Sequence, residues 1–218
     1  MTQEKTMPRK RDDAGKCIQA AMTLAGLSGW RNVSLYDIAE EAGLEVGEVV
    51  AAVDSRHGVI REMARRADAA MLAAVDEDWR EEGVRDRLFA LLMARFDNLR
   101  PHREGLRAVL TSLPADPLGA LTLAAEPGMR SMKLALEAAG VSSGGPLGRM
   151  RARALALAYG DAFRTFLDDD SDDLSRTMSA LDRRLKRLEN LAERFSRSRF
   201  GRSGRTGRPE SDTLPDAV

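Results

Sequence analysis

The chain has 218 residues, enough for one large domain or two small ones. Its 34 basic and 34 acidic residues cancel, so the net charge by itself identifies no partner. Hydrophobic residues make up 43% but aromatic residues only 5%, a composition that favours helices and argues against an aromatic-rich sandwich or barrel.

Apolar residues recur at helical spacing through most of the chain, and Gly, Pro and Ser interrupt the pattern at intervals. The predicted helices, in chain order, are 13–27, 34–43, 45–53, 55–79, 84–99, 100–113, a run from 117 that Pro127-Gly128 breaks, 129–139, 146–167 and 171–195. Segment 140–145 is the clearest internal loop. The sequence therefore predicts an all-α fold.

The second and third predicted helices form a helix-turn-helix unit. Ser34 offers an N-cap, with Asp37 at the capping-box position. Between the two helices, Ala42 is small enough for a close crossing, Gly43 can adopt a left-handed conformation and Leu44 can fill the corner. This pattern by itself also fits a helical hairpin with no role in DNA binding.

Residues 33–60, VSLYDIAEEAGLEVGEVVAAVDSRHGVI, resemble the DNA-binding core of the TetR family. The residues that carry the resemblance are Asp37-Ile38-Ala39, Glu41-Ala42-Gly43, Gly47 and Ser55-Arg56. It implies a TetR-like fold, with an N-terminal three-helix helix-turn-helix domain and a C-terminal helical bundle. It also implies a transcriptional regulator that binds a palindromic operator as a homodimer and is released or modulated by a small hydrophobic ligand.

The resemblance assigns DNA contacts to the start of the second helix, the third helix and the start of the fourth. These residues are Ser34, Tyr36, Glu45, Val46, Gly47, Glu48, Val50 and Arg56. The chain departs from the family pattern in two places. The family usually has Tyr and Phe where this chain has Val50 and Val53, and it has cationic or small polar residues where this chain has Glu45 and Glu48.

The charge of the helix-turn-helix opposes DNA binding. From Arg31 to Arg56 there are two cations and six acids, a net charge of −4 that would repel phosphates. The basic N-terminal residues Lys5, Arg9, Lys10 and Arg11 are either a compensating arm or an ordinary solvated tail.

The last predicted helix carries a heptad-like apolar seam. Its members are Leu174, Met178, Leu181, Leu185, Leu188, Ala192 and Phe195. Together with Leu147, Met150, Ala154 and Leu157 on the preceding helix, the seam would form a four-helix dimer interface, unless the monomer uses it internally.

Residues 166–191, FLDDDSDDLSRTMSALDRRLKRLENL, also resemble the end of the ubiquinone-biosynthesis accessory proteins, which share the TetR fold. This resemblance implies an alternative function, a lipid- or membrane-associated protein that has lost DNA binding. Peripheral membrane contact would then involve 171–195, a basic amphipathic helix.

A cavity between the C-terminal helices is the expected ligand site, although core packing is the alternative role of its residues. The candidates are Trp79, Phe89, Met93, Phe96, Met132 and Phe163. No catalytic motif and no metal-ligand spacing occurs around His57 or His102, so we expect neither an enzyme nor a cofactor.

The predicted organisation is a disordered basic arm (1–12), a DNA-binding domain (13–60), a ligand-binding and dimerisation domain (61–195) and a disordered Arg/Gly/Ser-rich tail (196–218). The single Cys17 excludes a disulfide framework within the chain and fits a reducing compartment. With no signal peptide and no membrane span in the sequence, we expect a cytoplasmic protein.

Overall fold

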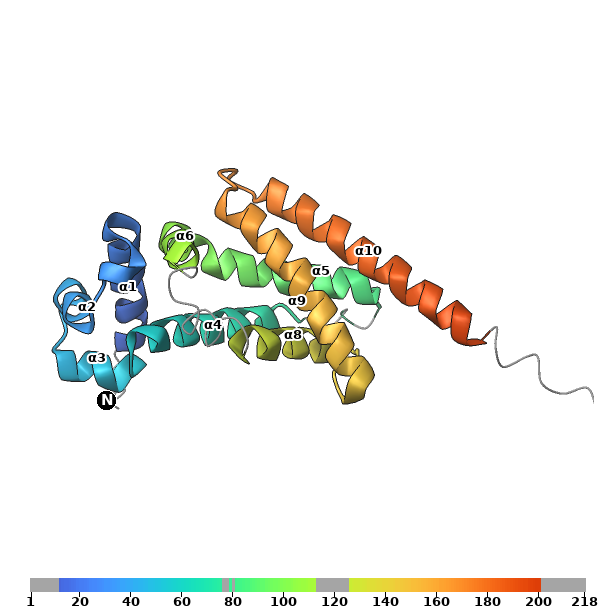
Figure 1. The fold of residues 1–218 in the computed structure, drawn as a ribbon, viewed down its shortest axis with the longest axis horizontal. Coiled ribbons are helices and arrows are strands. Elements are labelled where there is room, and N and C mark those ends of the chain that lie inside the picture. The colour runs from blue at the N-terminus through green and yellow to red at the C-terminus, as the bar shows by residue number, and fades with distance from the viewer. Residues whose placement is uncertain (1–11, 76–78, 80, 113–125, 201–218) are drawn as a thin grey trace, which may run out of the picture.

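The computed structural model describes residues 12–75, 79, 81–112 and 126–200, and every regular element in these ranges is a helix (Figure 1). The predicted all-α class is confirmed. The elements are α1 (Asp13–Ser28), η1 (Trp30–Asn32), α2 (Leu35–Ala42), α3 (Val46–Val53), α4 (Arg56–Ala73), α5 (Val84–Leu99), η3 (Arg100–His102), α6 (Arg103–Ser112), α8 (Glu126–Ala138), α9 (Gly145–Leu167) and α10 (Ser175–Phe200). In the described part of the chain, no helix is long and apolar enough to cross a membrane.

Helices α1, α2 and α3 form one end of the molecule (Figure 1). They pack around the fully buried side chains of Cys17, Ala21, Ile38 and Val49. Burial of these apolar surfaces drives the packing and fixes the angle between α2 and α3. Trp30 closes this small core from the side of η1.

Helix α4 connects this end to the rest of the protein. The predicted division at residue 60 falls inside α4, so the two regions share one continuous helix. The prediction that this helix continues to Trp79 is wrong, because α4 ends at Ala73. A helix that continued to Trp79 would carry the acids of the sequence at 76–78 in its last turn, where the helix dipole disfavours negative charge.

The other end is a bundle of α4, α5, α8, α9 and α10, in which α9 and α10 form an antiparallel pair (Figure 1). Its largest fully buried side chains include Phe96, Phe166 and Leu181. Helix α6 packs against α1 and thereby makes a second contact between the bundle and the helix-turn-helix.

Helix α10 differs from its prediction at both ends. It begins at Ser175, after Leu174, whose φ is 55°, and it continues to Phe200, so residues 196–200 are helical where a disordered tail was expected. Leu181 and Leu185 are buried within the monomer, whereas Leu191 and Ala192 are exposed. The first half of the predicted seam is therefore used inside the monomer.

Helix α8 begins at Glu126, so Pro127-Gly128 lies in its first turn, where proline is tolerated, rather than before the helix. Predictions for the run from 117, the basic arm and the end of the tail lie outside the described residues.

Candidate nucleic-acid interface

A complete capping box starts α2, as the sequence predicted. The Ser34 hydroxyl accepts a hydrogen bond from the Asp37 amide at 3.1 Å, and the Ser34 amide donates to the Asp37 carboxylate at 2.8 Å. The Ser34 hydroxyl and amide both donate to this carboxylate and hold the pKa of Asp37 below its usual value. Ser34 is therefore occupied in setting the start of α2.

The turn between α2 and α3 requires glycine. Gly43 has φ 62° and ψ 43°, the left-handed conformation that ends α2. The next residue, Leu44, donates its amide to the Ala39 carbonyl at 2.9 Å and buries its side chain in the corner. The predicted roles of both residues are confirmed.

A second tight turn fixes α3 against α4. Asp54 has φ 63°, which is uncommon for a residue with a side chain, and Ser55 caps α4 by accepting the Gly58 amide at 3.0 Å. A Cβ on Gly58 would overlap the Val53 carbonyl oxygen at 1.6 Å. Only glycine at position 58 allows α3 and α4 to meet this closely.

The outer face of the helix-turn-helix carries exposed apolar side chains. Tyr36 at the start of α2 is 67% exposed, and Val46 and Val50 on α3 are also exposed. Between them lies Gly47, where a Cβ would meet no atom within 4 Å. Packing within the protein therefore does not explain this glycine.

The two glutamates at the start of α3 lie in different environments. Glu48 is half-buried and accepts the Glu45 amide at 2.9 Å, so it helps to cap the helix. Glu45 is the N-cap residue, the other partner in this capping box, and it is exposed to solvent. Of the two, Glu45 is the acid whose charge is available to an approaching molecule.

Arg56, which the resemblance assigns to DNA, makes several contacts within the protein. Its Nη1 donates to the carbonyl oxygens of Trp30, Arg31 and Val33 at 3.3, 3.2 and 3.1 Å. Its guanidinium carbon also lies 5.3 Å from the centre of the Trp30 ring, a cation–π contact. The structure thus places Arg56 as a clamp that holds η1 and the start of α2 against α4.

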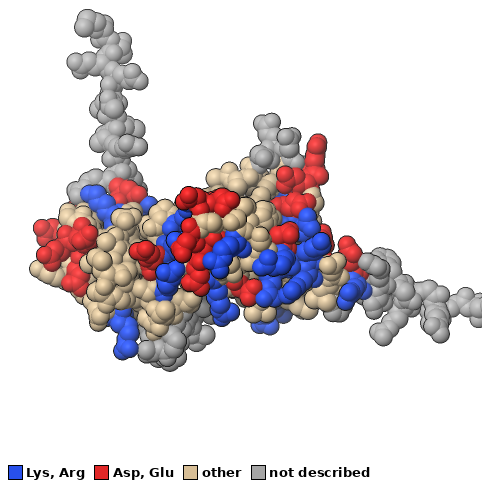
Figure 2. Space-filling model, turned by 90° about the horizontal axis from the view of Figure 1, so that it is seen from above, with Lys and Arg blue, Asp and Glu red and all other residues tan. Residues whose placement is uncertain are grey.

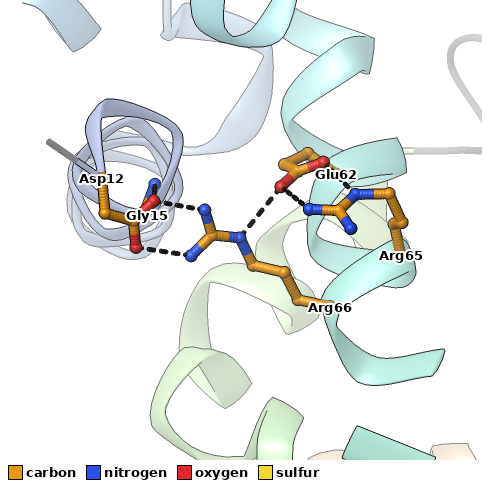
Figure 3. A network of polar contacts seen from close by, with 5 residues as sticks. All are labelled: Asp12, Gly15, Glu62, Arg65 and Arg66. Carbon is orange, nitrogen blue, oxygen red and sulfur yellow. Dashed lines mark hydrogen bonds and ion pairs between the residues drawn. The ribbon is translucent and has the colours of Figure 1, made fainter. Parts of the chain in front are cut away.

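A charged network joins the start of α1 to α4 (Figure 3). The Asp12 carboxylate accepts the Gly15 amide at 3.0 Å and two hydrogen bonds from Arg66, which also donates to Glu62 at 3.0 Å. Arg65 donates to Glu62 from the other side. The Arg66 hydrogen bonds are the main reason that the pKa of Asp12 falls to about 2.

Sequence patterns do not predict this network, because Asp12 and Arg66 are 54 residues apart. It fixes the point at which α1 starts, at its N-cap Asp12, against α4. That point lies next to α3 and the first half of α4 (Figure 1).

Most surface charge at this end is negative. Glu40, Glu41, Glu45 and Asp54 are exposed, and Arg31 is also exposed, while Arg56 is engaged internally. In Figure 2, acidic side chains gather at the helix-turn-helix end, and Lys and Arg gather over the other half of the same face.

The predicted ligand residues lie in or against the bundle core. Phe96 stacks on Tyr159 with ring centres 4.9 Å apart, and its ring centre lies 6.4 Å from that of Phe163. Trp79 donates its indole N–H to the Ala138 carbonyl at 2.8 Å. Met132 is buried, while Phe89 and Met93 are partly buried. Their role in ligand binding stays a prediction.

A surface groove of about 420 Å³ lies elsewhere, between α1, η3 and the turn at 170–172. None of the six predicted ligand residues lines it.

The acidic turn before α10 is a structural element. Asp169 is fully buried, and its carboxylate accepts hydrogen bonds from the amide and hydroxyl of Ser171 and from the amide and hydroxyl of Thr177. These residues lie in the segment that resembles the ubiquinone-biosynthesis proteins, and here they cap α10.

Neither a comparison with protein-family models nor a search of curated proteins finds a match. Solved structures do match. A TetR transcriptional regulator from Nitrosomonas europaea shares 22% identity over 79% of this chain and 95% of its own, with a TM-score of 0.64. One from Rhodococcus sp. RHA1 shares 17% identity over 82% of this chain and 96% of its own, with a TM-score of 0.54. The chain therefore has the TetR fold, an N-terminal helix-turn-helix followed by a helical bundle.

Proposed function

We propose that this protein is a cytoplasmic transcriptional regulator that binds DNA through α2 and α3. The observation that carries the proposal is the outer face of α3, where Gly47 has no packing role and lies between the exposed Val46 and Val50. A glycine at such a position lets a DNA backbone approach the helix closely. The structural neighbours, named as transcriptional regulators, support the same function.

We further propose that it acts as a homodimer and reads a palindromic site. Helix α9 leaves Leu147, Met150 and Leu157 exposed, the last of them to 77%, on the face predicted for dimerisation. Two copies joined there would place two recognition helices on one DNA duplex. A small hydrophobic ligand in the bundle would modulate the spacing of those helices.

Footprinting on the region upstream of the protein's own gene tests DNA binding. At about 50 mM salt, where phosphate contacts are strongest, we expect a protected palindrome. Loss of protection in Gly47→Leu, with wild-type stability, would assign the contact to α3. Absence of any binding by the wild-type protein at this salt concentration would refute the proposal.

Membrane contact through 171–195 is the second candidate, and one observation favours it. Leu191 is exposed on α10 beside the exposed Arg187 and Arg194. Flotation with anionic liposomes tests it. Recovery of all the protein in the soluble fraction would exclude it.

A further inference from the structure

A buried ion pair lies at the centre of the bundle. Arg95 of α5 donates directly to the Asp68 carboxylate of α4, and the two side chains are only 7% and 13% exposed. The fully buried Ser131 of α8 donates its hydroxyl to the other Asp68 oxygen at 3.0 Å. Arg95 Nε donates to the Tyr159 hydroxyl oxygen of α9 at 3.2 Å. The four residues, called here the Arg95 cluster, join four helices.

The Arg95 cluster borders an aromatic region. The guanidinium carbon of Arg95 lies 5.6 Å from the centre of the Tyr159 ring, and that ring stacks on Phe96. The ring centres of Phe163 and Tyr159 are 5.9 Å apart. Phe163 and Met93 pack against the core and are only partly buried.

Arg95 has a donor with no hydrogen-bond partner in the described part of the chain. Its Nη1 donates to Asp68 and to the Ala64 carbonyl, and its Nε donates to Tyr159. Among the described residues, none accepts a hydrogen bond from its Nη2. A planar guanidinium with a free nitrogen suits a carboxylate, which it can bind through two parallel hydrogen bonds.

The ion pair adds little to the stability of the fold beyond what apolar side chains of similar size would add. Burying two charges costs about as much as their attraction returns, and hydrophobic replacements of similar volume are often neutral or stabilising. Helix packing alone therefore does not explain why an arginine and an aspartate occupy this position.

We propose that Arg95 is the anion-binding residue of the bundle, and that its ligand is an amphipathic organic acid with an apolar chain or aromatic ring. The ligand carboxylate binds the Arg95 guanidinium in competition with the Asp68 carboxylate, and the apolar part lies along Phe96 and Phe163. This inference rests on the proposed function, since it names the class of ligand that would regulate the protein.

Replacement of the Asp68 carboxylate by the ligand carboxylate would couple ligand binding to the position of the helix-turn-helix. Asp68 and Arg56 belong to the same helix, and Arg56 clamps η1 and the start of α2. When the ligand replaces Asp68 on Arg95, the only polar contact of α4 with Arg95 among the described residues is the Ala64 carbonyl, and the ion pair between α4 and α5 is lost. Helix α4 is then held less tightly against α5 and can shift, carrying the clamp with it.

The test uses the full chain without DNA and measures binding by calorimetry. The probes are octanoate and phenylacetate, each compared with its neutral alcohol, octanol and phenylethanol. The wild-type protein should prefer the acids by about tenfold, the contribution of one charge-assisted hydrogen bond. Asp68→Asn, which removes the competing anion but keeps a partner for Ser131, should bind the acids about tenfold more tightly than the wild type.

Arg95→Gln should lose the preference for acids over alcohols. Arg184→Gln is the matched control, because Arg184 also pairs with an aspartate, Asp161, at 2.7 Å but on the surface. It should retain the wild-type preference. If Arg95→Gln does not fold, the double variant Asp68→Leu/Arg95→Met leaves no unpaired buried charge and should likewise bind acids no better than alcohols.

The proposal is overturned if neither acid binds wild-type protein or Asp68→Asn at about 1 mM, or if Asp68→Asn weakens acid binding. Either result would leave DNA binding in the footprinting experiment unaffected. Conversely, selective acid binding by a protein that protects no DNA would refute the proposed function alone.

Discussion

Gly105 of α6 lies so close to Met22 of α1 that a Cβ on Gly105 would stand 2.5 Å from the Met22 carbonyl oxygen. The contact joins the bundle to the helix-turn-helix and involves backbone atoms, which cannot move aside as a side chain can. Gly105→Ala should therefore lower the free energy of unfolding by about 1–3 kcal/mol, measured by urea denaturation.

Gly160→Ala is the control for this experiment. Gly160 lies within α9, and a Cβ there would meet nothing within 4 Å, so alanine should stabilise the helix by about 0.5–1 kcal/mol. Equal effects of the two substitutions would contradict a specific role for the contact between Gly105 and Met22.

Arg56→Lys should destabilise the protein even without DNA. The lysine nitrogen lies one bond short of the Arg56 Nη1 position and has no planar group to place over Trp30, so we expect a loss of about 1–3 kcal/mol. The exposed Arg31 provides the comparison, since Arg31→Lys should change stability by less than about 0.5 kcal/mol. Thermal unfolding of the two variants distinguishes the clamp from a DNA contact.

Acid should destabilise the protein in part through Asp169. Burial raises the pKa of this carboxyl, but hydrogen bonds from Ser171 and Thr177 outweigh burial and lower it to about 2 from an ordinary 3.8. Because the folded pKa is the lower one, the stabilisation is fully present well above pH 3.8 and is lost as the pH falls toward 2. It amounts to about 2 kcal/mol.

Unfolding free energies of wild type and Asp169→Asn at a series of pH values test this assignment. The two curves should converge as the pH approaches 2. A constant gap between them at every pH would mean that the charge of Asp169 contributes nothing.

Charge reversal at Glu45 should strengthen DNA binding. Glu45 is exposed at the start of α3, so Glu45→Lys removes a repulsion and adds about one phosphate contact, which steepens the salt dependence of the affinity. Glu82→Lys makes the same charge change at an exposed position before α5 and should have a smaller effect. Gel shifts at several salt concentrations measure both, and identical behaviour of the two variants would exclude proximity of Glu45 to DNA.

Leu157→Glu should dissociate the proposed dimer while the monomer stays folded, because Leu157 is 77% exposed. Leu181→Glu should instead unfold the protein, since Leu181 is fully buried and an unpaired buried charge costs several kcal/mol. Sedimentation measures whether each variant is a dimer or a monomer, and circular dichroism measures whether it is folded. A Leu157→Glu protein that remains dimeric would place the interface elsewhere.

The sequence predicted those features that depend on neighbours along the chain. The capping box of Ser34 and Asp37, the turn at Gly43 and the bounds of α5 are all local patterns, and each is confirmed. The exposed position of Val50 on α3 also follows from helical spacing once the turn is known.

Features that depend on contacts between distant residues could not be predicted in this way. The Arg56 clamp spans 23 to 26 residues and the pair of Arg95 with Asp68 spans 27, so no periodic pattern marks either. The family resemblance assigned Arg56 to DNA, and residue type could not reveal the clamp, because a guanidinium suits phosphate as well as it suits a carbonyl oxygen.

Helix α4 has a thermodynamic consequence for the whole protein. It is tied to the helix-turn-helix by Arg56 and Arg66 and to the bundle by Asp68, so neither part can lose α4 without exposing the core of the other. The two parts should therefore melt in a single calorimetric transition, with equal calorimetric and van't Hoff enthalpies. A TetR fold built in this way behaves as one cooperative unit, although the chain looks like two domains.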